Sequence, residues 1–405
     1  MHMHRLVAFV SVLGLLSGAV PVMSAQEPTA SAPIVPGAYI VLVKNSSDPE
    51  GTAKKHGISV NHVYKQVVHG FAASLNKHQV KELEGDADVW SIEPDRIVSI
   101  AAQTMPSGIN RVDADLSATA LINGIDERVD ADIAIIDTGI QKNHPDLNVV
   151  GGYNCTTNKT SNWADDNGHG THVAGTAAAL DNSIGVVGVA PGARLWAVKV
   201  LNRQGSGYLS WIICGIDWVT QRAATIDTAN MSLGGEFTSP AMDTSIHNAV
   251  AAGVVLTAAA GNSAKDAATF SPANNPEVIA VSAIADFNGL PGGGAPATCL
   301  SEVDDTFAYF SNFGSVVDIA APGVCILSTY KGSTYATLSG TSMAAPHVAG
   351  GAALYIASHG KPTNAAGVAA LKTALLTAAT SQASADGFTG DPDAFPEPLL
   401  NVGSF

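Results

Sequence analysis

The sequence predicts an α/β protein: a mostly parallel sheet with helices on both faces, preceded by a smaller α+β unit. After residue 100, short apolar runs alternate with helical patterns, and such alternation implies parallel strands joined by right-handed crossovers. Hydrophobic residues make up 46% of the 405 residues and charged residues 14%, which is enough apolar material for a large core. The net charge of −15 argues against nucleic acid and anionic membrane surfaces as partners.

Residues 1–25 have the pattern of a secretory signal peptide. Arg5 gives a basic start, residues 6–20 are apolar, and Ser24 with Ala25 offers a small-residue cleavage site. Residues 26–36 are rich in Pro, Ala, Ser and Thr, and we expect them to form a linker. No other segment has the length and apolarity of a membrane span, so we expect a secreted, extracellular protein.

Residues 37–101 are expected to form the small α+β unit. We expect strands at residues 38–43, within residues 60–75 and from residue 89 toward residue 100, with helices at residues 49–56 and 77–83. Asn76 is placed to cap the second helix. This order is typical of a split βαβ, ferredoxin-like fold.

Residues 102–405 are expected to form the large domain. We expect strands at residues 132–137, 194–201, 225–231, 254–259 and 278–283, and helices at residues 169–180, 208–223 and 239–252 and from Thr341 and Thr363. Residues 286–309, rich in Gly and Pro, are expected to form a surface loop. In such a fold ligands bind at the carboxyl ends of the strands, which is where Asp137, Ser232 and Asn262 fall.

The four cysteines, Cys155, Cys214, Cys299 and Cys325, form no close CxxC pair, which disfavours a zinc site. In an exported protein this even, dispersed set predicts two disulfides, for which three connectivities are possible. Cys299 lies in the surface loop and Cys325 in the next strand region. We therefore expect a local Cys299–Cys325 pair, which leaves Cys155 with Cys214.

Ser342 lies in residues 340–351 (GTSMAAPHVAGG), at the start of a small, apolar helical stretch. A serine there can attack a carbonyl and have the resulting oxyanion held by its own backbone N–H. Taken alone, the stretch fits an N-cap serine on a buried, Ala-rich helix better than a nucleophile. The function of Ser342 therefore depends on what the rest of the chain supplies.

His169 opens residues 169–176 (HGTHVAGT), at a helix mouth beside a glycine, where a general base has access to substrate. His172 and His347 lie deeper in their helices, and we expect them to be structural. Asp137 ends a buried strand, in the sequence Asp137-Thr138-Gly139, from which its carboxylate can orient an imidazole.

Together these three stretches resemble the signature stretches of the subtilisin-like serine proteases, the subtilase family, in that family's order of Asp, His and Ser. The resemblance runs from about residue 102 to the C-terminus and implies the family's three-layer α/β fold. It implies that Ser342 is the nucleophile, His169 the general base and then acid, and Asp137 the residue that orients the imidazole. The implied activity is a serine endopeptidase that acts on polypeptides as a monomer.

Residues 258–262 (AAAGN) resemble the family's oxyanion stretch, so the resemblance implies that the Asn262 amide donates to the oxyanion. Residues 230–235 (NMSLGG) resemble its substrate-binding edge. Ser232, Leu233, Gly234 and Gly261 are the substrate-binding residues that the resemblance implies. Since no charged residue occurs in these segments, we expect a broad, apolar specificity pocket.

Residues 37–101 resemble the inhibitory propeptide of the same proteases. Such a unit inhibits its own catalytic domain by leaving its tail, here residues 98–101, in the substrate groove. This implies a zymogen that cuts itself before Ala102, with Ala next to the cut and Val98 four residues back.

The resemblance further implies a structural calcium ion. Residues 144–147 (HPDL) and 180–186 (LDNSIGV) resemble the family's calcium-bearing segments. The implied ligands are the side chains of Gln103, Asp146 and Asn182 and the carbonyls of Leu180, Ile184 and Val186. All are oxygen donors, which suits Ca²⁺ better than zinc. A polar loop that interrupts a helix is the alternative for residues 180–186 alone.

Two other functions remain open at this stage. An inactive relative that serves as a binding protein usually lacks a triad residue or the oxyanion asparagine, and here all four are present. Peptide ligation proceeds through the same acyl-enzyme and depends on the exclusion of water. An α/β-hydrolase esterase is disfavoured, because Ala344 replaces the second glycine of the GxSxG motif.

Overall fold

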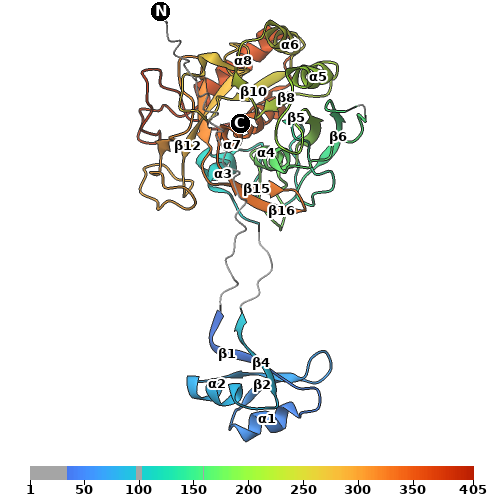
Figure 1. The fold of residues 1–405 in the computed structure, drawn as a ribbon. Coiled ribbons are helices and arrows are strands. Elements are labelled where there is room, and N and C mark those ends of the chain that lie inside the picture. Colours follow the sequence, from blue (N-terminus) through green and yellow to red (C-terminus); the bar gives the residue numbers. More distant parts are fainter. Residues whose placement is uncertain (1–33, 97–102, 158) are drawn as a thin grey trace, which may run out of the picture.

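The computed structural model describes residues 34–96, 103–157 and 159–405. The expected signal peptide, most of the expected linker, the tail at residues 98–101 and Ala102 lie outside this part. Figure 1 shows a small α+β unit, at the blue end of the sequence, and a large α/β unit. The α/β fold preceded by a ferredoxin-like unit is confirmed.

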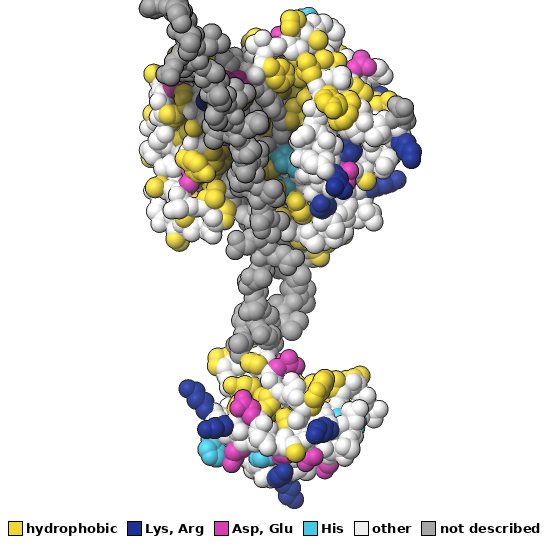
Figure 2. All heavy atoms as spheres, viewed as in Figure 1, with side chains coloured by type: hydrophobic (Ala, Val, Ile, Leu, Met, Phe, Trp, Pro, Cys, Tyr) yellow, Lys and Arg dark blue, Asp and Glu magenta, His cyan; other side chains and the backbone are white. Residues whose placement is uncertain are grey.

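The small unit is a four-stranded antiparallel sheet in the order β2-β3-β1-β4, with two helices. Its elements are β1 (Ile34–Val43), α1 (Pro49–Lys55), β2 (Val60–Tyr64), β3 (Gly70–Ser74), α2 (Lys77–Glu84) and β4 (Val89–Arg96). The Asn76 side chain caps α2, as expected. Val41, Phe71 and Leu83 form the centre of its core, and charged side chains surround apolar ones on the face seen in Figure 2.

The expected end of the linker at residue 36 is wrong. Strand β1 already begins at Ile34, because the backbone of Ile34 pairs with Arg96 of β4 beyond an irregularity in the register. The Pro, Ala, Ser and Thr content of residues 26–36 suggested a linker, but a strand tolerates proline where its hydrogen-bond ladder is interrupted.

The large unit contains an eight-stranded sheet in the order β13-β12-β10-β8-β5-β7-β6, with β14 also paired to β12. The strands are β5 (Asp132–Asp137), β6 (Val149–Asn154), β7 (Arg194–Lys199), β8 (Thr228–Met231), β10 (Val255–Ala259), β12 (Ile279–Ala285), β13 (Thr306–Phe307) and β14 (Ile319–Pro322). All pairs are parallel except β12 with β13. The expected strands were therefore placed correctly, to within a few residues.

Helices cover both faces of this sheet. They are α3 (Ser107–Arg111), α4 (His169–Ala178), α5 (Leu209–Thr220), α6 (Pro240–Ala251), α7 (Thr341–His359) and α8 (Ala365–Ala378), with short 3₁₀ turns at Ala114–Leu116 and Ala267–Thr269. Gly215 of α5 lies against Ile136, whereas Gly170 of α4 lies against Asp137. Adjacent side chains of a strand point to opposite faces, so α4 and α5 lie on opposite faces of the sheet.

Several short strands were not expected. They are β6, β13 and β14 in the main sheet, β16 (Thr334–Leu338), and the pair β9 (Gly235–Glu236) and β11 (Phe270–Ser271). Strand β13 interrupts the loop expected at residues 286–309, whereas β15 (Ile326–Tyr330), the hairpin partner of β16, lies in the strand region expected at Cys325. Their residues show no clear apolar alternation, and the pairing partners of all but β16 are distant in sequence. Helix α4 also ends at Ala178, two residues before its expected end.

Both expected disulfides are present. One joins Cys155, just after β6, to Cys214 in α5. The other joins Cys299, in the loop after β12, to Cys325, just before β15. No described helix has the combination of length and hydropathy needed to cross a bilayer.

Candidate active site

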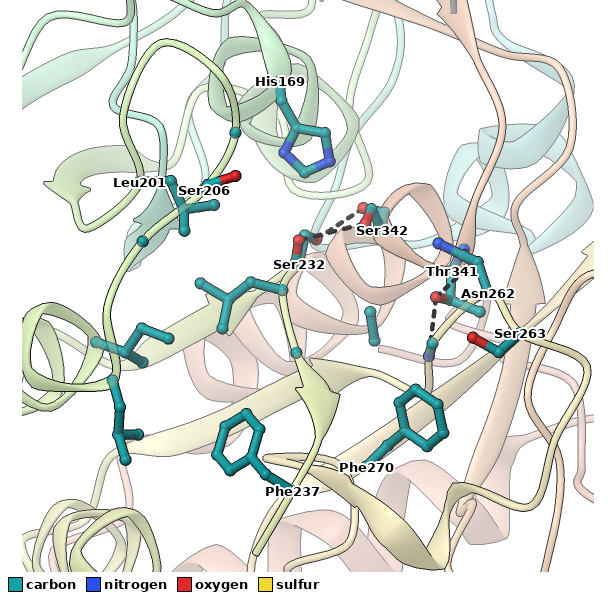
Figure 3. Close-up of a pocket in the computed structure, with 18 of the residues that line it drawn as sticks. His169, Leu201, Ser206, Ser232, Phe237, Asn262, Ser263, Phe270, Thr341 and Ser342 are labelled. Atoms are coloured by element: carbon teal, nitrogen blue, oxygen red, sulfur yellow. Dashed lines mark hydrogen bonds between the residues drawn. The ribbon is translucent and has the colours of Figure 1, made fainter. Parts of the chain in front are cut away.

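His169 and Asp137 meet where α4 begins and β5 ends. His169 Nδ1 lies 2.8 Å from Asp137 Oδ1 and 2.9 Å from Oδ2. The Asp137 side chain is fully buried, whereas that of His169 is 26% exposed. The imidazole is therefore fixed by a buried carboxylate on one side and open to the solvent-facing cavity on the other (Figure 3).

The environment of His169 acts on its pKa in two directions. Burial favours the neutral ring and lowers the pKa, whereas the charge of Asp137, the hydrogen bond to it and the charge of Asp165 favour the imidazolium. The effects that favour the imidazolium are together larger than the effect of burial, so the pKa of His169 lies above its ordinary value of 6.5. A ring of this kind can take up a proton during a reaction near neutral pH.

Three further residues, Thr138, Asp165 and Lys199, hold this pair in place, a role that the sequence patterns did not predict for them. Asp137 Oδ1 accepts a hydrogen bond from the Thr138 backbone N–H, and the Thr138 hydroxyl donates to Asp165. Asp165 also accepts from the backbone N–H groups that precede α4. The buried Lys199 donates to the Thr138 carbonyl. Asp165 has a sequence signal, because an aspartate just before a helix is typical of an N-terminal cap.

Ser342 lies in the first turn of α7, facing His169 across the cavity (Figure 3). The Ser342 hydroxyl donates to the Ser232 carbonyl at 3.3 Å. In return, the Ser232 hydroxyl donates to the Ser342 carbonyl at 2.7 Å. Ser232 follows the end of β8. Two hydrogen bonds thus connect the start of α7 to the residue just after the carboxyl end of β8.

Asn262 lies beside this helix start. Its Oδ1 accepts hydrogen bonds from the backbone N–H and the hydroxyl of Thr341, at 2.8 and 2.9 Å. Since the oxygen is occupied in this way, the orientation of the amide is set and its NH₂ group remains as a donor at the cavity. Gly261, just before it, has φ +109°, and a Cβ there would collide with Asn312, so this position requires glycine.

One cavity of about 700 Å³ connects these residues. Its lining residues are Asn167, His169, Leu201, Gly205, Ser206, Gly207, Leu209, Ile212, Ser232, Leu233, Gly234, Phe237, Ala259, Gly261, Asn262, Ser263, Phe270, Thr341 and Ser342. No Asp, Glu, Lys or Arg occurs among these described lining residues. Figure 3 shows the rings of Phe237 and Phe270 at one end, so this end of the cavity is apolar.

Comparison with known proteins agrees with this geometry. The model of the Subtilase family matches residues 130–393. The chain belongs to the subtilase family. The preceding residues 38–101 match the model of Peptidase inhibitor I9. The protein is therefore a subtilisin-like serine endopeptidase that carries an inhibitor-type propeptide domain.

Individual subtilases are similar over most of their length. Subtilisin NAT of Bacillus subtilis subsp. natto is 43% identical over 335 residues, which cover 81% of this chain and 82% of the relative. Subtilisin of Bacillus pumilus is 45% identical over 267 residues, 65% of this chain and 89% of the relative. The crystal structure of a cold adapted subtilisin-like serine proteinase matches with a TM-score of 0.58 at 33% identity, over 75% of this chain and 99% of that one.

Most of the residues expected to hold calcium come together in this subtilase. Gln103 Nε2 contacts the carbonyls of both Leu180 and Val186, at 2.6 and 3.2 Å. Asp146, fully buried, accepts from the side chain of Asn182 and the backbone N–H of Val186. Among the described residues, the Ile184 carbonyl is the one expected ligand without a hydrogen bond to the others, although the Ile184 N–H donates to Asn182 Oδ1.

Proposed function

We propose that this subtilase cleaves peptide bonds with Ser342 as nucleophile, His169 as general base and Asp137 as the residue that orients the imidazole. The observation that carries the proposal is the double contact of His169 Nδ1 with the buried Asp137 carboxylate, beside Ser342 in one cavity. That contact sets the tautomer, because it leaves Nε2 free to accept the Ser342 proton.

In this proposal the Ser342 Oγ attacks the substrate carbonyl while His169 takes its proton, and Asp137 stabilises the imidazolium. The tetrahedral oxyanion is held by the Ser342 backbone N–H, which is unpaired at the start of α7, and by the Asn262 amide. His169 then gives the proton to the leaving amine. A water molecule repeats the sequence on the acyl-enzyme and releases the second product.

We further propose that the substrate lies along Ser232, Leu233 and Gly234 as an added strand, with Gly261 on the other wall of the cavity. The apolar lining, including Phe237 and Phe270, supports a broad preference for apolar side chains next to the cut. The absence of charged side chains from the described lining disfavours selection of a basic or acidic residue at that position.

The residues near Asp146 fit a structural calcium ion. Two backbone carbonyls converge on the Gln103 amide, and rotation of that amide by 180° would present its oxygen at the same point. Burial raises the pKa of Asp146 to about 6, and a cation beside this desolvated carboxylate would favour its charged form. Gln103, Asp146, Asn182 and the carbonyls of Leu180 and Val186 would hold the ion, and Ile184 completes the proposed set.

The proposed organisation is a signal peptide at residues 1–25, a linker that ends before Ile34, a propeptide domain up to residue 101 and a catalytic domain at residues 102–405. The match to an inhibitor I9 domain supports autoinhibition by this unit. We propose that the protein is exported, removes its own propeptide and acts as a monomer. Neither nucleic acid nor a membrane is a proposed partner.

The experiment that tests the central proposal combines casein hydrolysis with active-site labelling. The mature protein is incubated with casein before and after treatment with a serine-reactive phosphonate. We expect hydrolysis to be lost as Ser342 is labelled, with the label located by peptide mass spectrometry. Hydrolysis that persists in a fully labelled protein, or in Ser342→Ala, contradicts the assignment.

A further inference from the structure

Glu397 is a buried carboxylate with no basic partner among the described residues. It lies in the segment after α8 and is 2% exposed. Neither of its carboxylate oxygens makes a hydrogen bond of normal geometry to the described residues. The negative charges of Asp391 and Asp393 act on Glu397 from nearby. A carboxylate in such surroundings normally has a compensating cation or hydrogen-bond donor.

Other buried side-chain oxygens without a partner belong to residues that act on Glu397 directly or contact Asp391. They are Ser282 Oγ, Gln382 Oε1 and Asp393 Oδ2. The Ser282 hydroxyl, on β12, lies beside the Glu397 carboxylate. Four side chains from three separate segments thus leave buried oxygen atoms without partners, and contacts or charge effects connect them through Asp391 and Glu397.

Asp391 ties two of these groups together. Its Oδ2 accepts from Gln382 Nε2 at 3.1 Å, and its Oδ1 accepts from the Asp393 backbone N–H at 3.2 Å. Because Gln382 Nε2 is bound to Asp391, its Oε1 is the amide atom that remains available. Asp391 therefore holds both Gln382 and the backbone of Asp393, and both of its own oxygens are occupied.

We propose that Ser282, Gln382, Asp393 and Glu397 bind a calcium ion, with Asp391 as a positioning residue. A hydroxyl, an amide oxygen and two carboxylates are all hard donors, which Ca²⁺ accepts in a flexible geometry and to which waters add. The described residues contain no group of three or more His, Cys, Asp or Glu side chains able to hold a metal. The proposed set uses two carboxylates, and neutral oxygens supply the rest.

This site is distinct from the one at Asp146. Ser282 is in β12, whereas Asp146 lies between β5 and β6. In the sheet, β10 and β8 separate β12 from β5, and β6 lies farther away still. The segment that follows Glu397 is bound to β14, since Ala320 N–H donates to the Pro398 carbonyl and Leu400 N–H to the Ala320 carbonyl. A bound ion would fasten the C-terminal segment to β12 as well.

The test counts calcium ions on the full-length chain carrying Ser342→Ala, which excludes self-digestion. Metal-free protein at pH 8.5 is dialysed to equilibrium against radioactive CaCl₂, and its melting temperature is measured with and without calcium. We expect Glu397→Gln, which keeps the shape of the side chain, to bind one ion fewer per chain and to show a smaller rise in melting temperature.

Asp393→Asn should lose the same ion, and it replaces Glu397→Gln if that variant does not fold. Glu277→Gln, which removes a partly exposed carboxylate that contacts His247, is the control and should bind as many ions as the parent. The proposal is overturned if Glu397→Gln or Asp393→Asn retains every ion of the parent. Because no arm measures proteolysis, this outcome is independent of the proposed catalytic mechanism.

Discussion

The Ser232 hydroxyl donates a hydrogen bond of 2.7 Å to the Ser342 carbonyl, the acceptor that Pro346 leaves without its helical partner. In a regular helix the N–H of residue 346 would bind this carbonyl, but proline has no N–H. The hydroxyl of Ser232, just after the end of β8, donates this hydrogen bond instead. The turn that carries Ser342 is thus positioned by a residue outside its own helix.

This relationship predicts a specific coupling. Ser232→Ala leaves the Ser342 carbonyl without its donor and should lower the free energy of unfolding by about 1–3 kcal/mol. In a Pro346→Ala background the penalty should be smaller, because the new N–H at position 346 can bind the same carbonyl. A double-mutant cycle by urea unfolding measures this difference. Equal penalties in both backgrounds would show that the bond does not depend on Pro346.

The pKa of His169 predicts the pH dependence of activity. The neutral imidazole is the base, and Asp137 raises its pKa above 6.5, so kcat/KM should rise with pH through an apparent pKa above that value. Asp137→Asn should lower this apparent pKa and reduce kcat by about 10⁴-fold, since the tautomer is no longer set. Steady-state hydrolysis of a peptide substrate from pH 5 to 10 measures both. An unchanged midpoint in the variant would contradict the role of Asp137.

Two buried histidines predict instability in acid. Burial lowers the pKa of His172 to about 3 and of His347 to about 4. The unfolded chain therefore binds these protons near pH 6.5 and the folded protein only at much lower pH, so stability falls as pH decreases from about 6.5 to 4. At about 1.4 kcal/mol per pKa unit, the loss should be on the order of a few kcal/mol.

Urea unfolding of the Ser342→Ala protein at pH 7 and at pH 5 tests this prediction. His172→Gln should reduce the difference between the two pH values, because glutamine does not titrate and can still donate to the Ile326 or Ala336 carbonyl. His247→Gln, at a largely exposed histidine, is the matched control. If the control and His172→Gln show the same pH difference, His172 is not a source of the acid sensitivity.

Maturation should depend on Ser342. In a host without other extracellular proteases, Ser342→Ala should accumulate as a precursor that begins near Gln26, whereas the wild-type protein should begin within one or two residues of Ala102. N-terminal sequencing of the secreted protein distinguishes the two. Normal processing of the alanine variant would mean that another protease removes the propeptide.

Chelation should destabilise the mature protein at the Asp146 site. An ion that binds only the folded state raises stability by mass action, so the melting temperature should fall when EDTA is added. The double variant Asp146→Ala, Asn182→Ala should respond less, since it lacks two of the proposed ligands. Calorimetry on phosphonate-inhibited protein, with Glu277→Gln as control, makes the comparison. A response in the double variant as large as in the wild type would exclude this site.

Local sequence patterns determined the elements of the fold. The apolar run that ends at Asp137 predicted β5 with its bounds, because a strand buried on both faces has no polar side chain within it. The glycine-flanked motifs at His169 and Ser342 likewise predicted where α4 and α7 begin. The positions of the cysteines favoured one of three possible connectivities, and the structure has that pairing.

Only the tertiary structure decided which residues meet. The hydrogen bond from Ser232 to Ser342 joins residues that are 110 positions apart in the sequence. The contact of Lys199 with Thr138 spans 61 positions, and that of Gln103 with Leu180 spans 77. Glu397, close to the C-terminus, lies beside Ser282 of β12. Each residue's preference for helix, strand or turn can be inferred from the sequence, because this preference depends only on neighbours a few positions away. Which strands lie side by side is set by the packing of the whole sheet, and that packing brings these side chains together.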